Sequence, residues 1–208
     1  MENTEQVNSS LYKGKYVELC IAKGPGYNYE FVHETRCDGH IVAILPVHVE
    51  RGILLRQEFT PCWGGDLNIS SITGGWEKAK HRTPLDTAIE ELREEAGIIV
   101  REESSIRSLG TCRGTKSSDN LYHLFLVDLS DDEYDEVAID GDGSALERKA
   151  HNEWMPTGFD VDEESDSFIL DSPWIMNGRD PLLYVMYTRW VMGMSQRISR
   201  GHYKDMLI

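Results

Sequence analysis

The alternation of apolar and polar residues predicts strands along the first third of the chain. Residues 16–21 and 29–35 alternate in the way that half-buried strands do, and the sequence Lys-Gly-Pro-Gly at 23–26 predicts a turn between them. Residues 40–49 form a nearly continuous apolar run, which is typical of a buried strand. Residues 53–59 follow a short turn and are expected to pair with this strand as a hairpin.

The rest of the chain adds two strands and a C-terminal helix. Residues 106–112 and 120–129 read as strands, and the second of these has the clearest pattern in the chain. Apolar residues recur at helical spacing after Pro181, and Asp180 is placed to cap a helix that begins there. Residues 1–10 are mostly polar, and we expect them to be disordered.

Residues 74–97 combine a glycine loop with a short helix whose two ends are both marked. Thr83 can serve as the N-cap, Pro84 suits the first helical position, and Asp86 completes a variant of the capping box. Gly97 can adopt the left-handed conformation that ends a helix. The sequence therefore predicts a helix between Thr83 and Gly97.

Four glutamates crowd the C-terminal half of this helix: Glu90, Glu91, Glu94 and Glu95. Like charges on neighbouring helix positions cost roughly 0.2–0.5 kcal/mol per pair, and the helix dipole disfavours anions at this end. A solvated acidic face is the simpler interpretation, but it leaves this cost uncompensated. A divalent cation would compensate it, and magnesium prefers oxygen ligands, so we favour a metal site.

The segment from Glu90 to Ile98 resembles the signature of the Nudix hydrolases. That signature reads Arg-Glu-aliphatic-x-Glu-Glu-x-Gly-aliphatic, and only its arginine is replaced, by Glu90. Arg82 stands where the signature has an earlier glutamate, and the loop from Gly75 is one residue longer than usual. Because Arg82 and Glu90 are eight residues apart, as their counterparts are, we predict a reversed ion pair between them.

The resemblance implies a fold and a domain organisation. The expected class is α/β (α+β), with the Nudix fold: a mixed sheet sandwiched between helices, preceded by an N-terminal antiparallel sheet. Residues 1–37 would form the N-terminal strands, which serve dimerisation and substrate binding. Residues 38–208 would form the hydrolase domain with its C-terminal helix.

The resemblance also implies a metal site. Glu91, Glu94 and Glu95 would hold Mg2+ (or Mn2+), together with the backbone carbonyl of Gly74. Glu91 and Glu95 are four residues apart and can share one ion, while Glu94 can complete a second site or polarise the attacking water. Glu94 is therefore a catalytic candidate as well as a metal ligand.

A general base is expected on a loop that follows the sheet. Glu147 is our choice because glycines flank its loop, which lets the loop close over a substrate. Glu136 and Glu153 are the alternatives, and a plain surface role for Glu147 also stays open.

The order of Tyr29-Glu30, an apolar strand and Arg56-Gln57 is similar to that in the ADP-ribose pyrophosphatase branch of the family. Many members have an arginine two residues after the glutamine, where it grips the pyrophosphate, but this chain has Phe59 there. Arg56 is the candidate substitute, although neighbouring residues on a strand face opposite sides. By resemblance Tyr29 would stack on adenine, and an ordinary hairpin aromatic is the alternative.

The resemblance implies Mg2+-dependent hydrolysis of the pyrophosphate bond of a nucleoside diphosphate linked to another moiety, above all ADP-ribose or a related ADP-sugar. The alternatives are a pyrophosphohydrolase of nucleoside triphosphates or nucleotide sugars and a catalytically inactive Nudix protein that binds a ligand for regulation. A metal-free interaction protein fits the charge but does not explain the glycines.

Composition narrows the choice of partners. The net charge of −15 over 208 residues argues against nucleic acid and anionic membranes and leaves a small nucleotide-derived substrate. No signal peptide precedes the first strand, and the cysteines form no paired motif, so we expect reduced thiols in a cytoplasmic protein. The family resemblance implies a homodimer. The cysteines are Cys20, Cys37, Cys62 and Cys112.

Overall fold

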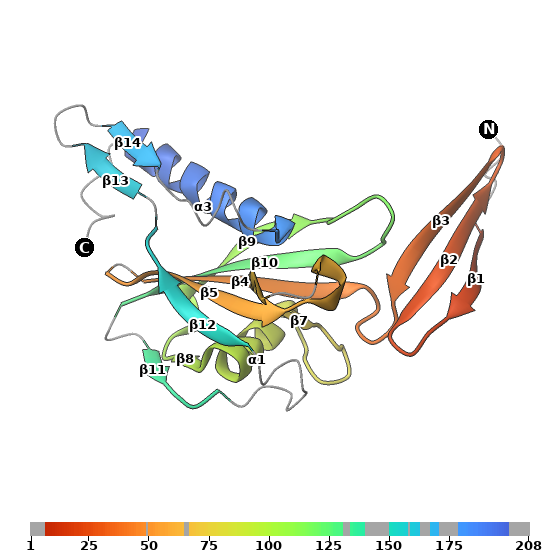
Figure 1. Cartoon of the computed structure of the whole chain (residues 1–208), viewed down its shortest axis with the longest axis horizontal. Helices are drawn as coiled ribbons and strands as arrows, with labels where there is room; N and C mark the ends of the chain where they lie inside the picture. The colour runs from red at the N-terminus through yellow and green to blue at the C-terminus, as the bar shows by residue number, and fades with distance from the viewer. Residues whose placement is uncertain are drawn as a thin grey trace.

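A computed structural model describes residues 7–48, 50–64, 67–130, 134–139, 150–157, 159–162, 167–170 and 179–199. Its main body is a mixed sheet with one helix on each face, and a separate antiparallel sheet extends from one end (Figure 1). No helix among these residues is both long enough and apolar enough to cross a membrane.

The first three strands form the separate sheet, in the order β1 (Val7–Lys13), β2 (Val17–Gly24) and β3 (Tyr27–Glu34). The turn between β2 and β3 lies at residues 25–26, where Gly26 takes a φ of 80°. Residues 7–10 belong to β1, so the expected disorder was wrong for them. Backbone pairing with β2 builds this strand, and its polar side chains gave no apolar alternation to indicate it.

The main sheet has the order β12-β5-β4-β10-β9, with β6 paired to β5 and β7 paired to β4. β4 and β10 run parallel and the other pairs are antiparallel, which makes the sheet mixed. Its strands are β4 (His40–His48), β5 (Gly52–Phe59), β6 (Leu67–Ser70), β7 (Ile72–Gly75), β9 (Ile106–Cys112), β10 (Leu121–Leu129) and β12 (His151–Met155).

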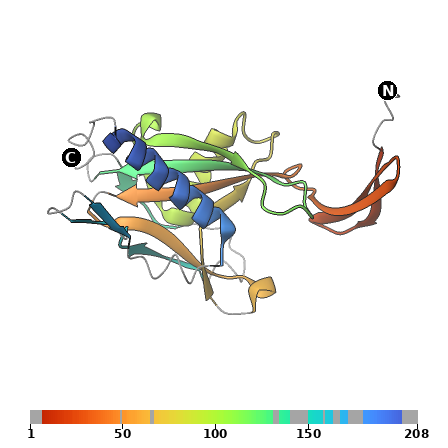
Figure 2. The same ribbon diagram turned by 90° about the horizontal axis from the view of Figure 1, so that it is seen from above.

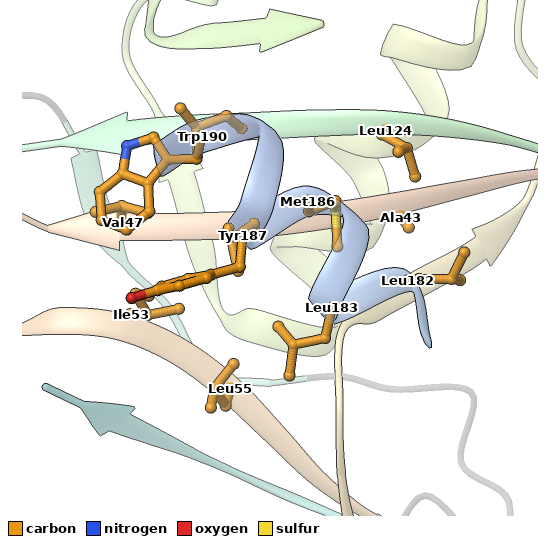
Figure 3. Close-up of a cluster of buried hydrophobic side chains, with 12 residues drawn as sticks. Ala43, Val47, Ile53, Leu55, Leu124, Leu182, Leu183, Met186, Tyr187 and Trp190 are labelled. Atoms are coloured by element: carbon orange, nitrogen blue, oxygen red, sulfur yellow. The ribbon is translucent and has the colours of Figure 1, made fainter. Parts of the chain in front are cut away.

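Helices α1 (Pro84–Ala96) and α3 (Pro181–Ser199) cover opposite faces of this sheet (Figures 1 and 2). Side chains alternate between the faces along β4, so Val42 and Ile44 pack in the cluster that contains Leu92 of α1. Ala43, Leu45 and Val47 point the other way, into the cluster beneath α3, whose residues are drawn in Figure 3. The continuous apolar run of β4 follows from burial on both faces.

The predicted ends of α1 are confirmed. The Thr83 hydroxyl accepts a hydrogen bond from the Asp86 amide at 3.2 Å, and the Asp86 carboxylate accepts one from the Thr83 amide at 2.8 Å. Gly97 follows the helix with a φ of 68°. The remaining elements are short: η1 (Pro61–Trp63), β8 (Ile98–Val100), η2 (Glu103–Ser105), β11 (Tyr134–Glu136), β13 (Phe159–Asp162) and β14 (Ser167–Leu170).

Asp180 joins the start of α3 to the strand that leads into the glycine loop. Its side chain is buried, and one oxygen accepts a hydrogen bond from the Leu182 amide at 2.8 Å, as a helix cap does. The other oxygen accepts from the amide and the hydroxyl of Ser71, at 2.7 and 2.5 Å. Ser71 lies between β6 and β7, so Asp180 fixes α3 against the strand that ends at Gly75.

We expect Asp180→Ala to lower the free energy of unfolding by about 3 kcal/mol, because it removes a cap and leaves buried donors of Ser71 unpaired. Asp180→Asn keeps an acceptor and should cost less. Urea denaturation measures both changes against Glu102→Ala, an exposed substitution that should shift stability by no more than about 0.5 kcal/mol. An Asp180→Ala protein as stable as this control would contradict the assignment.

Candidate active site

The carboxylate of Glu91 lies directly against the backbone of Gly74. A Cβ atom added to Gly74 would fall 1.9 Å from Oε1 of Glu91 and 2.1 Å from its carboxyl carbon. Any side chain at position 74 would therefore displace the Glu91 carboxylate. The structure thus brings together two of the residues that the sequence assigned to metal binding.

The protonation of Glu91 is perturbed by its surroundings. Burial and, to a smaller extent, the neighbouring charge of Glu94 raise the pKa of Glu91 to about 7. The positive charge of Arg36 acts in the opposite direction, and Arg56 does so more weakly. A half-buried acid that titrates near neutrality beside a second acid is typical of functional sites.

Arg56 holds the C-terminal end of α1 from beneath. Its side chain is only 1% exposed, and Nη1 donates a hydrogen bond to the backbone carbonyl of Glu95 at 3.0 Å. Asn152 is the partner of Arg56 on the neighbouring strand β12, and its Nδ2 donates to the same carbonyl at 2.7 Å. Two adjacent strands therefore supply donors to one carbonyl oxygen in the last turn of the helix.

This arrangement corrects two expectations. The acidic cluster does have compensation within the protein, since Nε of Arg56 lies 3.7 Å from the Glu95 carboxylate and the guanidinium faces the negative end of the helix dipole. A metal ion is therefore not needed to explain why these acids persist. Arg56 is also too deeply buried for the direct substrate contact that we expected, and it acts on the helix instead.

Glu58 is a further acid at this site that the sequence reasoning missed. It lies two residues after Arg56 on β5 and therefore on the same face of the sheet, with Oε2 at 3.4 Å from Nε of Arg56. The carboxylates of Glu58 and Glu95 thus flank one nitrogen atom. In the sequence, the two-residue spacing between Arg56 and Glu58 was the signal that could have indicated that both face the same side of the sheet.

The predicted pair between Arg82 and Glu90 is replaced by a pair one residue earlier. Nε2 of His81 lies 2.8 Å from the Glu90 carboxylate, whereas Arg82 is exposed. The carbonyl of His81 also accepts a hydrogen bond from the indole of Trp76 at 3.1 Å. The glycine loop is therefore still connected to α1, because its extra residue places His81 rather than Arg82 opposite Glu90.

The two candidates for general base within the described residues, Glu136 and Glu153, contact other side chains. Glu147 lies outside the described residues. Glu136 forms an ion pair with Arg51 at 2.5 Å. Glu153 accepts a hydrogen bond from Gln57 at 2.7 Å, and the alternation along β12 places it on the face of the sheet away from α1.

Tyr29 lies on β3 of the separate N-terminal sheet. The residue is 45% exposed, and its hydroxyl donates a hydrogen bond to the carbonyl of Lys116 at 2.7 Å. Within one chain the structure does not bring Tyr29 to the acids of α1, which belong to the main body (Figure 1).

Among the residues that the structure describes, no three acidic, histidine or cysteine side chains are already grouped as metal ligands. A cavity of about 350 Å³ lies along α1 but includes none of the three predicted metal-binding glutamates. It is lined by His81, Asp86, Ile89, Glu90, Arg93 and Ile99. The Glu91 and Gly74 contact, not this cavity, therefore defines the candidate site.

The pKa of Glu91 predicts how stability changes with pH. The folded protein holds this proton up to about pH 7, and an unfolded chain releases it near pH 4.5, so ionisation destabilises the fold as pH rises through that window. We expect Glu91→Gln to remove this loss and to gain up to about 3 kcal/mol relative to wild type between pH 5 and 8. Urea unfolding in the presence of a chelator measures the difference, and parallel pH profiles for the two proteins would contradict it.

Comparison with known proteins supports the fold. No family model matches the chain, and no curated protein matches its sequence. The crystal structure of an ADP compounds hydrolase superposes with a TM-score of 0.55 at 13% identity, over 76% of this chain and 80% of that one. The NUDIX domain of Shewanella oneidensis NrtR, complexed with ADP ribose, gives a TM-score of 0.41 at 12% identity, over 56% and 71%. The chain has an α+β architecture, a mixed sheet between two helices, that matches the Nudix fold.

Proposed function

We propose that this protein is a Mg2+-dependent hydrolase of the pyrophosphate bond in ADP-ribose or a related ADP-sugar. The observation that supports this most is the Glu91 carboxylate, half-buried against Gly74 and beside the charge of Glu94. The structural similarity to an ADP compounds hydrolase is consistent with the same chemistry.

The donor set fits a hard divalent cation. Glu91, Glu94 and Glu95 offer carboxylate oxygens, and Gly74 offers a backbone carbonyl, which are the ligand types that Mg2+ takes while it keeps several waters. When bound, the ion would neutralise phosphoryl oxygens and lower the barrier to attack by water.

The protein's own side chains would then position the reactants. Arg56 and Asn152 hold the helix end from which Glu94 and Glu95 project, so the spacing of these acids is fixed before a ligand arrives. Glu94 is our candidate for polarising the attacking water, and Glu147 stays our candidate for the general base.

A second candidate function is a Nudix-fold protein that binds a nucleotide ligand without turnover. The compensation of the helix acids by Arg56 favours it, since the acids can persist without an ion. The contact of His81 with Glu90 favours the hydrolase, because the loop and helix stay connected despite the altered signature.

We also propose a cytoplasmic homodimer formed through the N-terminal sheet. Tyr12, Leu19 and Val32 are cross-strand neighbours that form an exposed apolar row across β1, β2 and β3. Such a row on a three-stranded sheet is typical of a protein interface. All four cysteines are free thiols, as is usual in a reducing compartment.

The proposal predicts Mg2+-dependent release of AMP from ADP-ribose, tested beside dinucleotide polyphosphates, NADH, nucleotide sugars and nucleoside triphosphates. Glu94→Gln should lower kcat by about 100-fold or more, as expected when a group that acts in the transition state is removed. Glu102→Gln removes an equal charge from an exposed site and should leave kcat unchanged. Full activity of Glu94→Gln would overturn its assigned role, and no turnover of any substrate would favour the binding protein.

Gly74→Ala should weaken metal binding while leaving the stability of the fold nearly unchanged. The new methyl group meets only the flexible Glu91 side chain among its nearest atoms, so stability should change by no more than about 1 kcal/mol. Displacing the carboxylate should weaken Mn2+ binding, followed by calorimetry, by about tenfold or more. Gly193→Ala on the exposed side of α3 is the control and should bind Mn2+ as wild type does. Equal Mn2+ affinity in Gly74→Ala would exclude Glu91 as a ligand.

A further inference from the structure

Arg36 lies beside the glycine loop, next to the candidate site. It belongs to the turn between β3 and β4, and its side chain is exposed. Its Nη2 atom lies 3.3 Å from the position that a Cβ atom on Gly75 would occupy. Its positive charge also acts on Glu91, as the reduced pKa shift of that acid shows. The guanidinium therefore faces the space between the glycine loop and the acidic helix.

The other cations near this space are already engaged. Lys78 contacts Asp38 at 3.2 Å, Lys80 contacts Glu77 at 2.8 Å, and Arg93 contacts Glu94 at 2.9 Å. Arg56 is buried beneath the helix end. Within the part of the chain that the structure describes, Arg36 makes no hydrogen bond or ion pair, so none of those residues occupies its donors.

The backbone that carries Arg36 is held in place by its neighbour. Cys37 is buried, and both its amide and its thiol donate to the Glu34 carboxylate at 3.0 Å. Burial and the Glu34 contact raise the pKa of the Cys37 thiol to about 12, so it stays protonated as a donor. The backbone next to Arg36 is thus anchored before a ligand binds, which limits the entropy lost on binding.

We propose that Arg36 binds the pyrophosphate group of the substrate, in the place of the arginine that Phe59 replaces. This inference rests on the proposed function, since it assigns a substrate contact at the same site. A planar guanidinium can donate two parallel hydrogen bonds to a phosphoryl group, which gives both attraction and orientation. A protein with a net charge of −15 needs such a local cation to hold a dianionic ligand beside three glutamates.

The test measures binding separately from turnover. Calorimetry uses the α,β-methylene analogues of ADP-ribose and of ATP, in which carbon replaces the bridging oxygen, with Mg2+ present. Arg36→Ala should weaken binding of the preferred analogue by about 10- to 100-fold, the usual loss for charge-assisted hydrogen bonds. Arg36→Lys should recover part of the affinity, because it keeps the charge but loses the paired donors.

Arg82→Ala is the matched control, since it removes the same charge from another exposed arginine and should change the dissociation constant by less than about twofold. The urea midpoint of Arg36→Ala should equal that of wild type, which excludes a purely structural effect. Unchanged affinity in Arg36→Ala, or no binding of either analogue by wild type, would overturn the proposal. Arg36-dependent binding by a wild-type protein that hydrolyses nothing would support the proposal and refute the hydrolase function instead.

Discussion

The candidate site depends on the hydrogen bonds that end helix α1. The backbone carbonyl of Glu95 accepts from Arg56 and Asn152, side chains of two neighbouring strands of the main sheet. The last carbonyls of a helix normally lack a hydrogen-bond partner within the helix, and here side chains from the sheet donate to one of them. A positive charge at the same point offsets the helix dipole and part of the acidic cluster. The acids can therefore stand together without unfolding the helix that carries them.

The two hydrophobic clusters make that contact possible. Alternate side chains of strand β4 pack against α1 and against α3, so the sheet lies between two helices (Figures 2 and 3). Asp180 then links the start of α3 to Ser71, close to the strand that ends at Gly75. The glycine loop and the helix are thus positioned from both faces of the sheet, and Glu91 meets Gly74 as a consequence.

Two arginines near the contact between Glu91 and Gly74 have different surroundings. Arg56 is buried and bound to the helix end, which makes it part of the scaffold. Arg36 is exposed beside Gly75, where its guanidinium can reach a ligand at the site that we propose. Phe59 stands where the resemblance led us to expect an arginine, and we propose that the substrate contact comes from the turn after the N-terminal sheet. That turn lies between the sheet proposed to dimerise and the site proposed to react.

The sequence by itself determined the elements whose causes are local. The cap at Thr83 and the left-handed end at Gly97 depend on neighbouring residues alone, and both are present in the structure. Tertiary structure decided what depends on long-range partners. Whether Arg56 faces a ligand or a helix end, and whether His81 or Arg82 meets Glu90, follows from how strands and loop pack against α1. Such contacts join residues far apart in the sequence, so the packed core sets their geometry. One extra residue in a loop, or a shift of one residue along a strand, changes which side chain makes the contact.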